Sequence, residues 1–329
     1  MNHNDWLSLQ TEGLQLTQSI LKNSKGEITD DHFNYEFYQN EQFLEKFSIN
    51  PKSAFLTLKI NKIIDLYRII GIFKNYYANY GIKILYRGQN NLYNYQQRPN
   101  LFRNLQRNSL DSHNNLIRNK LSEISEKVYN FAYNEKIERN NKFDFSNYIA
   151  LEGVLQHYNE ETRFIDLVDD LRVALWFSFI KPDYNQRINH QINELEESHI
   201  FLYGISTPDS ISRGVLEGST QRLINLREAT PPTALRPHIQ QASVLADNYL
   251  FSIDEKTNDL LAFLSDYRKY ILCVISIKTD VIRKYLYPKT SKVNLERKLD
   301  IIFNQYFPSE NDDQFLAELN KRKSILFYL

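Results

Sequence analysis

The chain has 329 residues and a mass of 39.1 kDa, and 42% of its residues are hydrophobic, enough for the core of one large domain or two modest ones. Its 40 basic and 40 acidic residues cancel, so no overall field draws it onto nucleic acid or an anionic membrane. The single cysteine, Cys273, excludes an intramolecular disulfide and a cysteine zinc cluster. We find no basic N-terminal region followed by an apolar stretch, and no apolar run near the roughly 20 residues of a membrane span, so we expect a cytoplasmic protein.

The N-terminal third predicts an extension followed by a helix and a strand. Residues 1–54 are polar and weakly periodic, typical of a helical or irregular extension. The run from Ser53, "SAFLTLKINKIIDLYRIIGIFKNYY", has apolar residues at helical spacing, and "ANYG" interrupts it before the predicted strand 82–88, "IKILYRG". Residues 104–140 suit an amphipathic surface helix. A main domain over 55–290 accommodates these elements.

The remainder of the chain alternates between helical and strand patterns. Predicted helices cover "SNYIALEGVLQHYN" and "DDLRVALWFSFIKP", and predicted strands cover "RFIDLV", "SHIFLYGIS" and "KYILCVISIK". Beyond Ile277 the pattern is helical, so we expect a C-terminal helical extension over 291–329, packed on the core. The widely separated strands predict an α+β fold with a mixed central β-sheet region flanked by helices.

Common catalytic and ligand-binding motifs are absent from the sequence. It contains no phosphate-binding glycine loop, no G-x-S-x-G elbow and no H-E-x-x-H zinc motif. The seven histidines lack metal-ligand spacing, and the acids of "EETRFIDLVDD" alternate with apolar and basic residues, as at a solvated helix start. We therefore expect no metal site.

The stretch "KILYRGQNN" ends a predicted strand on an arginine, Arg87, that nothing nearby in the sequence neutralises. One interpretation is a structural pair with an acid from elsewhere in the fold, for which Asp166 is the candidate. The other is that Arg87 binds an anion that is not part of the protein. Arg163 lies three residues from Asp166 and is its nearer partner, so we predict a structural ion pair between those two residues.

Three separated blocks resemble the FRG domain, a bacterial family named for an aromatic-Arg-Gly motif. The blocks are "LYRGQNNLYNYQQRPNLFRN", "YIALEGVLQHYNEETRFIDLVDDLRVALWFSFI" and "RPHIQQASV". The later family signatures run approximately L-x-x-x-Q-H-Y-G-x-P-T-R-L-L-D-W-T and R-I-x-x-Q-x-G-x-F. Here "NEETR" replaces G-x-P-T-R and "DLV" replaces D-W-T. The resemblance covers about residues 55 to 290.

The arrangement is also similar, more distantly, to the NAD-binding half of ADP-ribosyltransferases, which implies a related core. By this resemblance Arg87 binds phosphate and ribose, since its planar guanidinium matches phosphate oxygens. Gly88 lets the ligand approach the backbone. The residues implied in ligand binding are Arg87, Gly88, Gln89, Thr162 and Arg236, and those implied in catalysis are His157, Tyr158 and Gln240.

The late position that carries a carboxylate in such enzymes is matched here by Gln240, which can hydrogen-bond but supplies no charge. Glu217 and Glu228 are alternatives for that position, although their spacing requires neither. Each site residue also has a structural interpretation: Gln156, His157 and Tyr158 fasten a helix end, and Arg236 and Gln240 anchor a loop.

Three functions follow as hypotheses. The first is an NAD-using ADP-ribosyltransferase-like enzyme or NAD glycohydrolase, with an unknown macromolecular acceptor, serving as an intracellular toxin or antiviral (antiphage) defence effector. The second is a non-catalytic module that senses NAD or another anionic nucleotide. The third is a protein-interaction module in which the polar residues pair among themselves.

Overall fold

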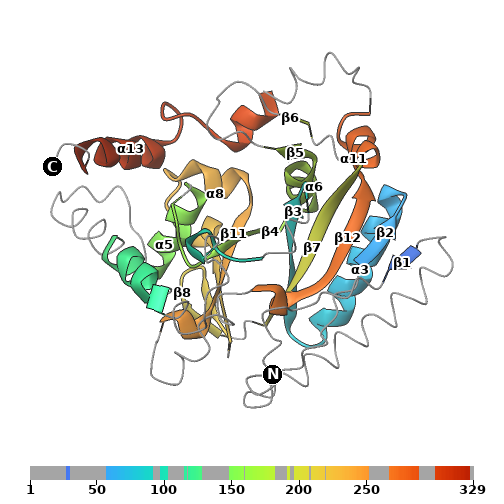
Figure 1. Cartoon of the computed structure of the whole chain (residues 1–329), viewed down its shortest axis with the longest axis horizontal. Coiled ribbons are helices and arrows are strands. Elements are labelled where there is room, and N and C mark those ends of the chain that lie inside the picture. Colours follow the sequence, from blue (N-terminus) through green and yellow to red (C-terminus); the bar gives the residue numbers. More distant parts are fainter. Residues whose placement is uncertain are drawn as a thin grey trace.

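The computed structural model describes residues 27–29, 57–91, 97–102, 115–116, 118–127, 148–158, 160–181, 191–192, 196–206, 209–218, 220–251, 267–288 and 301–326. The main feature of these residues is a mixed sheet of ten strands in the order β1-β2-β12-β7-β3-β4-β11-β10-β9-β8 (Figure 1). Neighbouring strands are antiparallel, apart from the parallel pair β2 and β12.

The strands are β1 (Glu27–Thr29), β2 (Thr57–Ile60), β3 (Ile82–Gln89), β4 (Ile165–Val168), β7 (Glu197–Ser206), β8 (Asp209–Ser212), β9 (Val215–Glu217), β10 (Gln221–Asn225), β11 (Ala242–Asp247) and β12 (Ile271–Lys278). Strands β5 (Ile180–Lys181) and β6 (Gln191–Ile192) form a separate pair. The pairing in the large sheet is shortest between β3 and β4, which share one register pair, Tyr86 with Val168. We call strands β1, β2, β12, β7 and β3 the β3 half, and strands β4, β11, β10, β9 and β8 the β4 half.

The labelled helices are α3 (Ile63–Ala78), α5 (Tyr148–His157), α6 (Leu171–Phe179), α7 (Leu226–Ala229), α8 (Leu235–Ile239), α11 (Thr279–Leu286) and α13 (Gln314–Leu326). Residues 115–116 and 118–127 are also helical and lie within the predicted surface helix 104–140. Short 3-10 turns occupy η3 (Asn100–Phe102), η4 (Asn248–Phe251) and η5 (Tyr267–Tyr270), and residues 301–306 are helical. None of these described helices combines the length and apolar character needed to cross a membrane.

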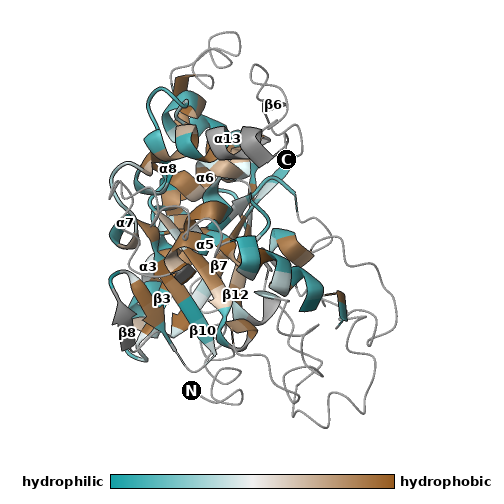
Figure 2. Cartoon of the chain, turned by 90° about the vertical axis from the view of Figure 1, so that its left-hand side faces the viewer, coloured by the Kyte–Doolittle hydropathy of each residue, from teal (hydrophilic) through white to brown (hydrophobic). Residues whose placement is uncertain are grey.

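Two hydrophobic clusters form the core, and the alternation of side chains along β3 assigns its two faces to them. Ile84 and Tyr86 belong to the cluster that includes residues of α3, α6 and α11, whereas Leu85 belongs to the cluster that contains Phe201 and α5. Figure 2 shows the hydrophobic residues concentrated on the strands and on the helices packed against them. The face of β3 that carries Leu85 is therefore the inner face, turned toward the β4 half.

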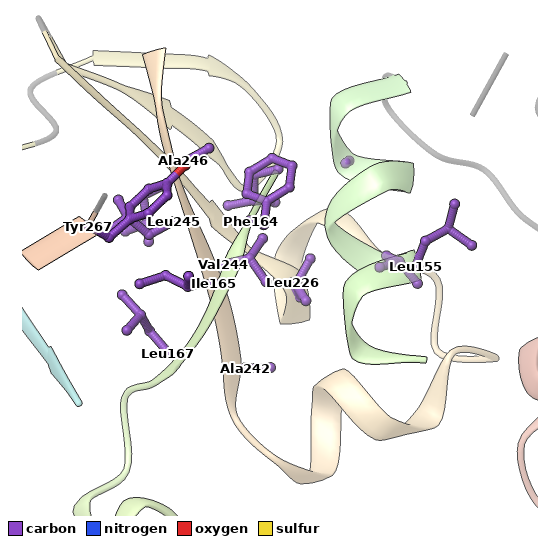
Figure 3. Close-up of a cluster of buried hydrophobic side chains, with 14 of the residues drawn as sticks. Leu155, Phe164, Ile165, Leu167, Leu226, Ala242, Val244, Leu245, Ala246 and Tyr267 are labelled. Carbon is purple, nitrogen blue, oxygen red and sulfur yellow. The ribbon is translucent and has the colours of Figure 1, made fainter. Parts of the chain in front are cut away.

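In the β4 half, both faces of β4 and β11 are buried (Figure 3). Leu155 of α5 lies near Val244 and Leu226 on one side, whereas Ile165 and Leu167 point to the other side. Asp166 is the register partner of Val244, and directly opposed residues share a face. Asp166 consequently points toward α5.

The α+β class with a mixed sheet and flanking helices is confirmed, and so are the strands predicted around Arg87, over "RFIDLV", over "SHIFLYGIS" and over "KYILCVISIK". The helix predicted from Ser53 is wrong at its start. Residues 57–60 form β2, and α3 begins only at Ile63. β2 gains a parallel partner in β12, which lies more than 200 residues further along the chain, and this pairing overrides the local helical spacing.

Candidate functional site

Arg87 lies on the inner face of β3, at the junction of the two half-sheets. Its Nη1 donates a hydrogen bond of 2.8 Å to the backbone carbonyl oxygen of Asp166, not to the carboxylate. Its Nε is buried and has no hydrogen-bond partner among the described residues. Within the same part of the chain, no acidic side chain pairs with this half-buried guanidinium. The bond links β3 to β4, and within the described residues Arg87 forms no ion pair.

The carboxylate of Asp166 is held instead by the end of α5. Gln156 Nε2 donates to Asp166 Oδ2 at 3.0 Å, and His157 Nδ1 lies 3.7 Å from Asp166 Oδ1. The Asp166 side chain keeps 36% of its surface accessible, although Oδ1 itself is buried without a hydrogen bond. Asp166 therefore offers a partly accessible carboxylate on the residue whose backbone carbonyl bonds Arg87, and the hydrogen bond from Gln156 sets its orientation.

His157 is a neutral imidazole in this environment. Burial lowers its pKa, the Asp166 carboxylate opposes this effect, and the Arg236 guanidinium adds to it. Its Nε2 is buried and, among the described residues, bonded to nothing. With Nδ1 next to a carboxylate, the tautomer that carries the proton on Nδ1 leaves Nε2 as a hydrogen-bond acceptor.

Thr162 positions Gln156. Its side chain is fully buried, and its hydroxyl donates to Gln156 Oε1 at 2.5 Å while accepting from the backbone N–H of Phe164 at 3.3 Å. The hydroxyl thus fixes the orientation of the Gln156 amide, so that its nitrogen faces Asp166. Thr162 contacts the site through Gln156, and its predicted role in ligand binding stays a prediction.

Gly88 is required by helix packing, and its predicted role in ligand approach stays a prediction. A Cβ at this position would lie 1.8 Å from the carbonyl oxygen of Ala174 and 2.9 Å from the backbone nitrogen of Ser178. Both atoms belong to α6, which packs on the outer face of β3. Gly88 therefore places α6 directly on the strand, while Arg87 and Gln89 point to the inner face. Gln89 accepts a hydrogen bond of 2.8 Å from Gln97 Nε2.

The predicted ion pair between Arg163 and Asp166 is also wrong. Arg163 binds Glu152 of α5, with Nε at 3.0 Å and the backbone nitrogen at 3.1 Å from Oε1. The same guanidinium donates to the carbonyl of Leu250 at 2.8 Å and lies over the ring of Phe251 at 4.5 Å. Asp166 points toward the C-terminal end of α5, whereas Arg163 reaches Glu152 near its middle. Sequence proximity suggested the wrong partner.

Tyr158 and Arg236 attach the C-terminal segment to the core. Tyr158 Oη donates to Asp313 Oδ2 at 2.6 Å, and the backbone nitrogen of Arg236 donates to the same oxygen at 3.2 Å. The Arg236 guanidinium lies between the rings of Tyr158 and Phe307, at 5.0 and 5.3 Å, and donates to the carbonyl of His157 at 3.3 Å. These contacts give both residues a structural role, and the catalytic role of Tyr158 and the ligand-binding role of Arg236 stay predictions.

Gln240 and the two glutamates do not complete the site. The Gln240 amide donates to the carbonyl of Tyr306 at 2.7 Å, which fastens residues 301–306 to the end of α8. Glu217 pairs with Arg222 at 3.0 Å on β9 and β10, at the far edge of the β4 half. Glu228 accepts a hydrogen bond of 2.5 Å from Asn225. Asp166 is bonded to Arg87 of β3 through its backbone carbonyl and to Gln156 of α5 through its carboxylate.

Sequence patterns did not identify four further polar residues of the fold, Glu152, Asp313, Gln97 and His199. Glu152 interrupts the apolar helix "YIALEGVLQH", which was a usable signal for a buried ion pair. Asp313 lies in the polar run "SENDDQF", where nothing distinguishes a fully buried acid from its solvated neighbours. Clusters of histidine, cysteine, aspartate or glutamate that would hold a metal are absent from the described residues.

These elements define an α+β protein in which Arg87, at the junction of the two half-sheets, forms no ion pair with a described residue. Residues 82–187 match the family model of the FRG domain. The match covers β3, α5, β4 and α6, and with them Arg87, His157 and Asp166, whereas Arg236 and Gln240 lie outside it. No curated protein and no solved structure matches the chain significantly. The likeness to ADP-ribosyltransferases thus stays a prediction.

Proposed function

We propose that the chain binds NAD through Arg87 and cleaves its nicotinamide–ribose bond, as an ADP-ribosyltransferase-like enzyme or an NAD glycohydrolase. The observation that carries this proposal is the bonding of Arg87. Its guanidinium is half-buried and, among the described residues, bonds the backbone carbonyl of Asp166, whereas the carboxylate of Asp166 is bonded by Gln156. Removing a cation from water without a counter-charge is costly, and a bound phosphate supplies that charge.

Asp166 supplies the negative charge that such chemistry requires. Departure of nicotinamide leaves positive charge on the ribose, and a carboxylate close to that centre stabilises it. Gln240 cannot do this because it is uncharged and its amide is bonded to Tyr306. We therefore assign the role expected of the late carboxylate to Asp166. Gln156 and His157 are positioning residues that orient it, and Thr162 in turn orients Gln156.

The neutral state of His157 fits this assignment. Because burial lowers its pKa, the imidazole does not place a positive charge beside Asp166 near neutral pH. The carboxylate therefore keeps its full attraction for the developing charge. A protonated histidine at 3.7 Å would weaken that attraction, so we expect activity to fall as the pH drops far enough to protonate His157.

The test is nicotinamide release from NAD labelled in the nicotinamide, together with transfer of adenine-labelled ADP-ribose to proteins of a cell lysate. Asp166→Asn keeps the shape of the side chain and removes its charge, so we expect NAD to bind while turnover falls at least 100-fold. Arg87→Ala should weaken NAD binding itself. Lys83→Ala is the matched control, because Lys83 lies on the same face of β3 but forms a surface ion pair with Asp169 at 3.3 Å. A wild-type protein that neither binds NAD nor releases nicotinamide, with or without lysate, would refute the proposal.

The biological setting that we propose is an effector of the toxin or antiviral defence type. Consumption of NAD, or modification of an essential acceptor, harms the cell that contains the active protein. Expression of the wild type should therefore slow growth, and Asp166→Asn at equal expression should restore it. Equal growth with both proteins, despite turnover in vitro, would remove the effector role and leave the enzymatic proposal.

A second candidate is a non-catalytic sensor of NAD or another anionic nucleotide. The observation that favours it is the use of Tyr158, Arg236 and Gln240 in structural contacts, which leaves few groups for catalysis. It predicts NAD binding that depends on Arg87 without any nicotinamide release. A protein-interaction module, the third hypothesis, predicts that NAD does not bind at all.

A further inference from the structure

A row of polar side chains crosses four neighbouring strands of the β3 half. Gln89 of β3 is the register partner of His199 of β7, His199 is the partner of Ser276 of β12, and Ser276 is the partner of Lys59 of β2. Opposed residues in a sheet share a face, so the four side chains form one continuous row. Figure 1 shows these strands side by side.

This row lies on the same face as Arg87. Arg87 precedes Gln89 by two residues, and side chains alternate along a strand, so the two point to the same side about 6.6 Å apart. Gly88 between them faces α6 on the other side. Phe201, the register partner of Arg87, belongs to the same cluster as Leu85, as expected for the inner face. The row therefore continues the Arg87 site along the inner face of the sheet.

Within the row, His199 differs from its neighbours in its bonding. Ser276 donates to Glu197 Oε2 at 2.7 Å, Lys59 pairs with Glu197 Oε1 at 3.5 Å, and Gln89 accepts from Gln97. His199 is 93% buried, since only 7% of its surface is exposed, yet its Nδ1 has no partner in the described part of the chain. A buried polar nitrogen without a partner loses its hydrogen bonds to water and gains none in return, so native proteins rarely contain one.

The charge state of His199 defines what it can bind. Burial lowers its pKa to about 4, with Glu197 opposing this effect and Lys59 adding to it. Near neutral pH the imidazole is therefore uncharged, with one donor and one acceptor. The neighbouring Gln89 carboxamide also carries both. A neutral pair of this kind suits hydroxyl groups, which donate and accept, and it offers no charge to a second phosphate.

We infer that His199 and Gln89 form a subsite for the ribose hydroxyls of the nucleotide whose phosphate Arg87 binds. The inference rests on the proposed function, because it takes the ligand at Arg87 to be a ribonucleotide. In a nucleotide the ribose is covalently joined to the phosphate, and Gln89, the first residue of the row, lies two residues after Arg87 on β3. Arg87 would therefore face the phosphate, and the neutral side chains of Gln89 and His199 would face the adjoining ribose.

Calorimetric titration of the full chain with NAD, ADP-ribose and inorganic pyrophosphate tests this subsite. His199→Phe keeps an aromatic ring and removes both hydrogen-bonding nitrogens. It should weaken NAD and ADP-ribose about 10-fold, or about 1.4 kcal/mol, and leave pyrophosphate unchanged. His199→Asn restores a donor and an acceptor near the position of Nδ1 and should recover part of the affinity. Arg87→Ala should weaken all three ligands.

Gln89→Leu removes the hydrogen-bonding groups of the second residue of the proposed subsite. It therefore tests the subsite even if the His199→Phe protein does not fold. It should reproduce the selective loss for the two ribose-containing ligands. If both variants bind NAD as tightly as the wild type while Arg87→Ala does not, the subsite is wrong and the proposed function stands. Pyrophosphate affinity that falls in parallel with NAD affinity also overturns the subsite, because it indicates a structural effect. If the wild type binds neither NAD nor ADP-ribose, both proposals are wrong.

Discussion

Replacement of Gly88 by alanine tests whether this glycine is required for packing. The added Cβ would lie 1.8 Å from the carbonyl oxygen and 2.7 Å from the carbonyl carbon of Ala174, and 2.9 Å from the nitrogen of Ser178. These are backbone atoms of α6, so no side-chain rotation relieves the contact, and α6 must move away from β3. Overpacking of this kind costs about 3 kcal/mol of folding free energy or more.

Urea unfolding, followed by circular dichroism, measures this loss. A cost of about 3 kcal/mol lowers the midpoint by about 1 M urea if the slope is about 3 kcal/mol per M. Gly71→Ala is the matched control: it lies in α3, a Cβ there meets nothing within 4 Å, and alanine should stabilise the helix by about 1 kcal/mol. A Gly88→Ala protein with an unchanged midpoint but impaired NAD binding would show that the glycine serves a ligand after all.

Three further results are expected. Glu152→Gln leaves the buried Arg163 guanidinium without its counter-charge, so unfolding free energy should fall by about 3 to 5 kcal/mol in urea titrations; a loss below 1 kcal/mol would contradict the pairing. Tyr158→Phe removes the hydrogen bond to buried Asp313 and should cost about 1 to 3 kcal/mol and speed amide hydrogen exchange in α13; unchanged exchange there would show that Tyr158 does not fasten this helix. Because the pKa of His199 is lowered to about 4, the unfolded chain binds a proton that the folded chain does not, and stability should fall between pH 6.5 and about 4. His199→Gln should make unfolding in this window less pH-dependent than in the wild type, and equal slopes for the two proteins would refute the assignment.

Local sequence patterns predicted the elements that are long and strongly apolar. β3, β7 and β12 were expected because each is an apolar run bounded by turn-forming residues. The strands β9 to β11 were not predicted, because "VLE", "QRLIN" and "ASVLAD" are short and partly polar, and only their pairing in the sheet makes them strands. The same limit applies to β2, which depends on β12.

The candidate site could be predicted in part. Arg87 and His157 were identified because an aromatic-Arg-Gly strand end and a Q-H-Y helix end are visible in the sequence. The partners were not, because they depend on which faces meet in space: α5 brings Gln156 to Asp166 and Glu152 to Arg163. A spacing of three residues suggested that Arg163 and Asp166 pair, but they point to different parts of α5.

We propose that Arg87 binds a phosphate-containing ligand and does not serve only to join β3 to β4. Equilibrium affinity for NAD should be measured for the wild type, Arg87→Lys and Arg87→Ala, with Lys83→Ala as the control and thermal unfolding followed on each. We expect NAD to bind the wild type and the control equally, to bind Arg87→Lys more weakly because the fork of donors is lost, and to bind Arg87→Ala at least about 10-fold more weakly. Two results would refute phosphate binding by Arg87. One is an Arg87→Ala protein that binds NAD like the wild type. The other is a wild type that does not bind NAD, together with an Arg87→Ala protein that unfolds more easily.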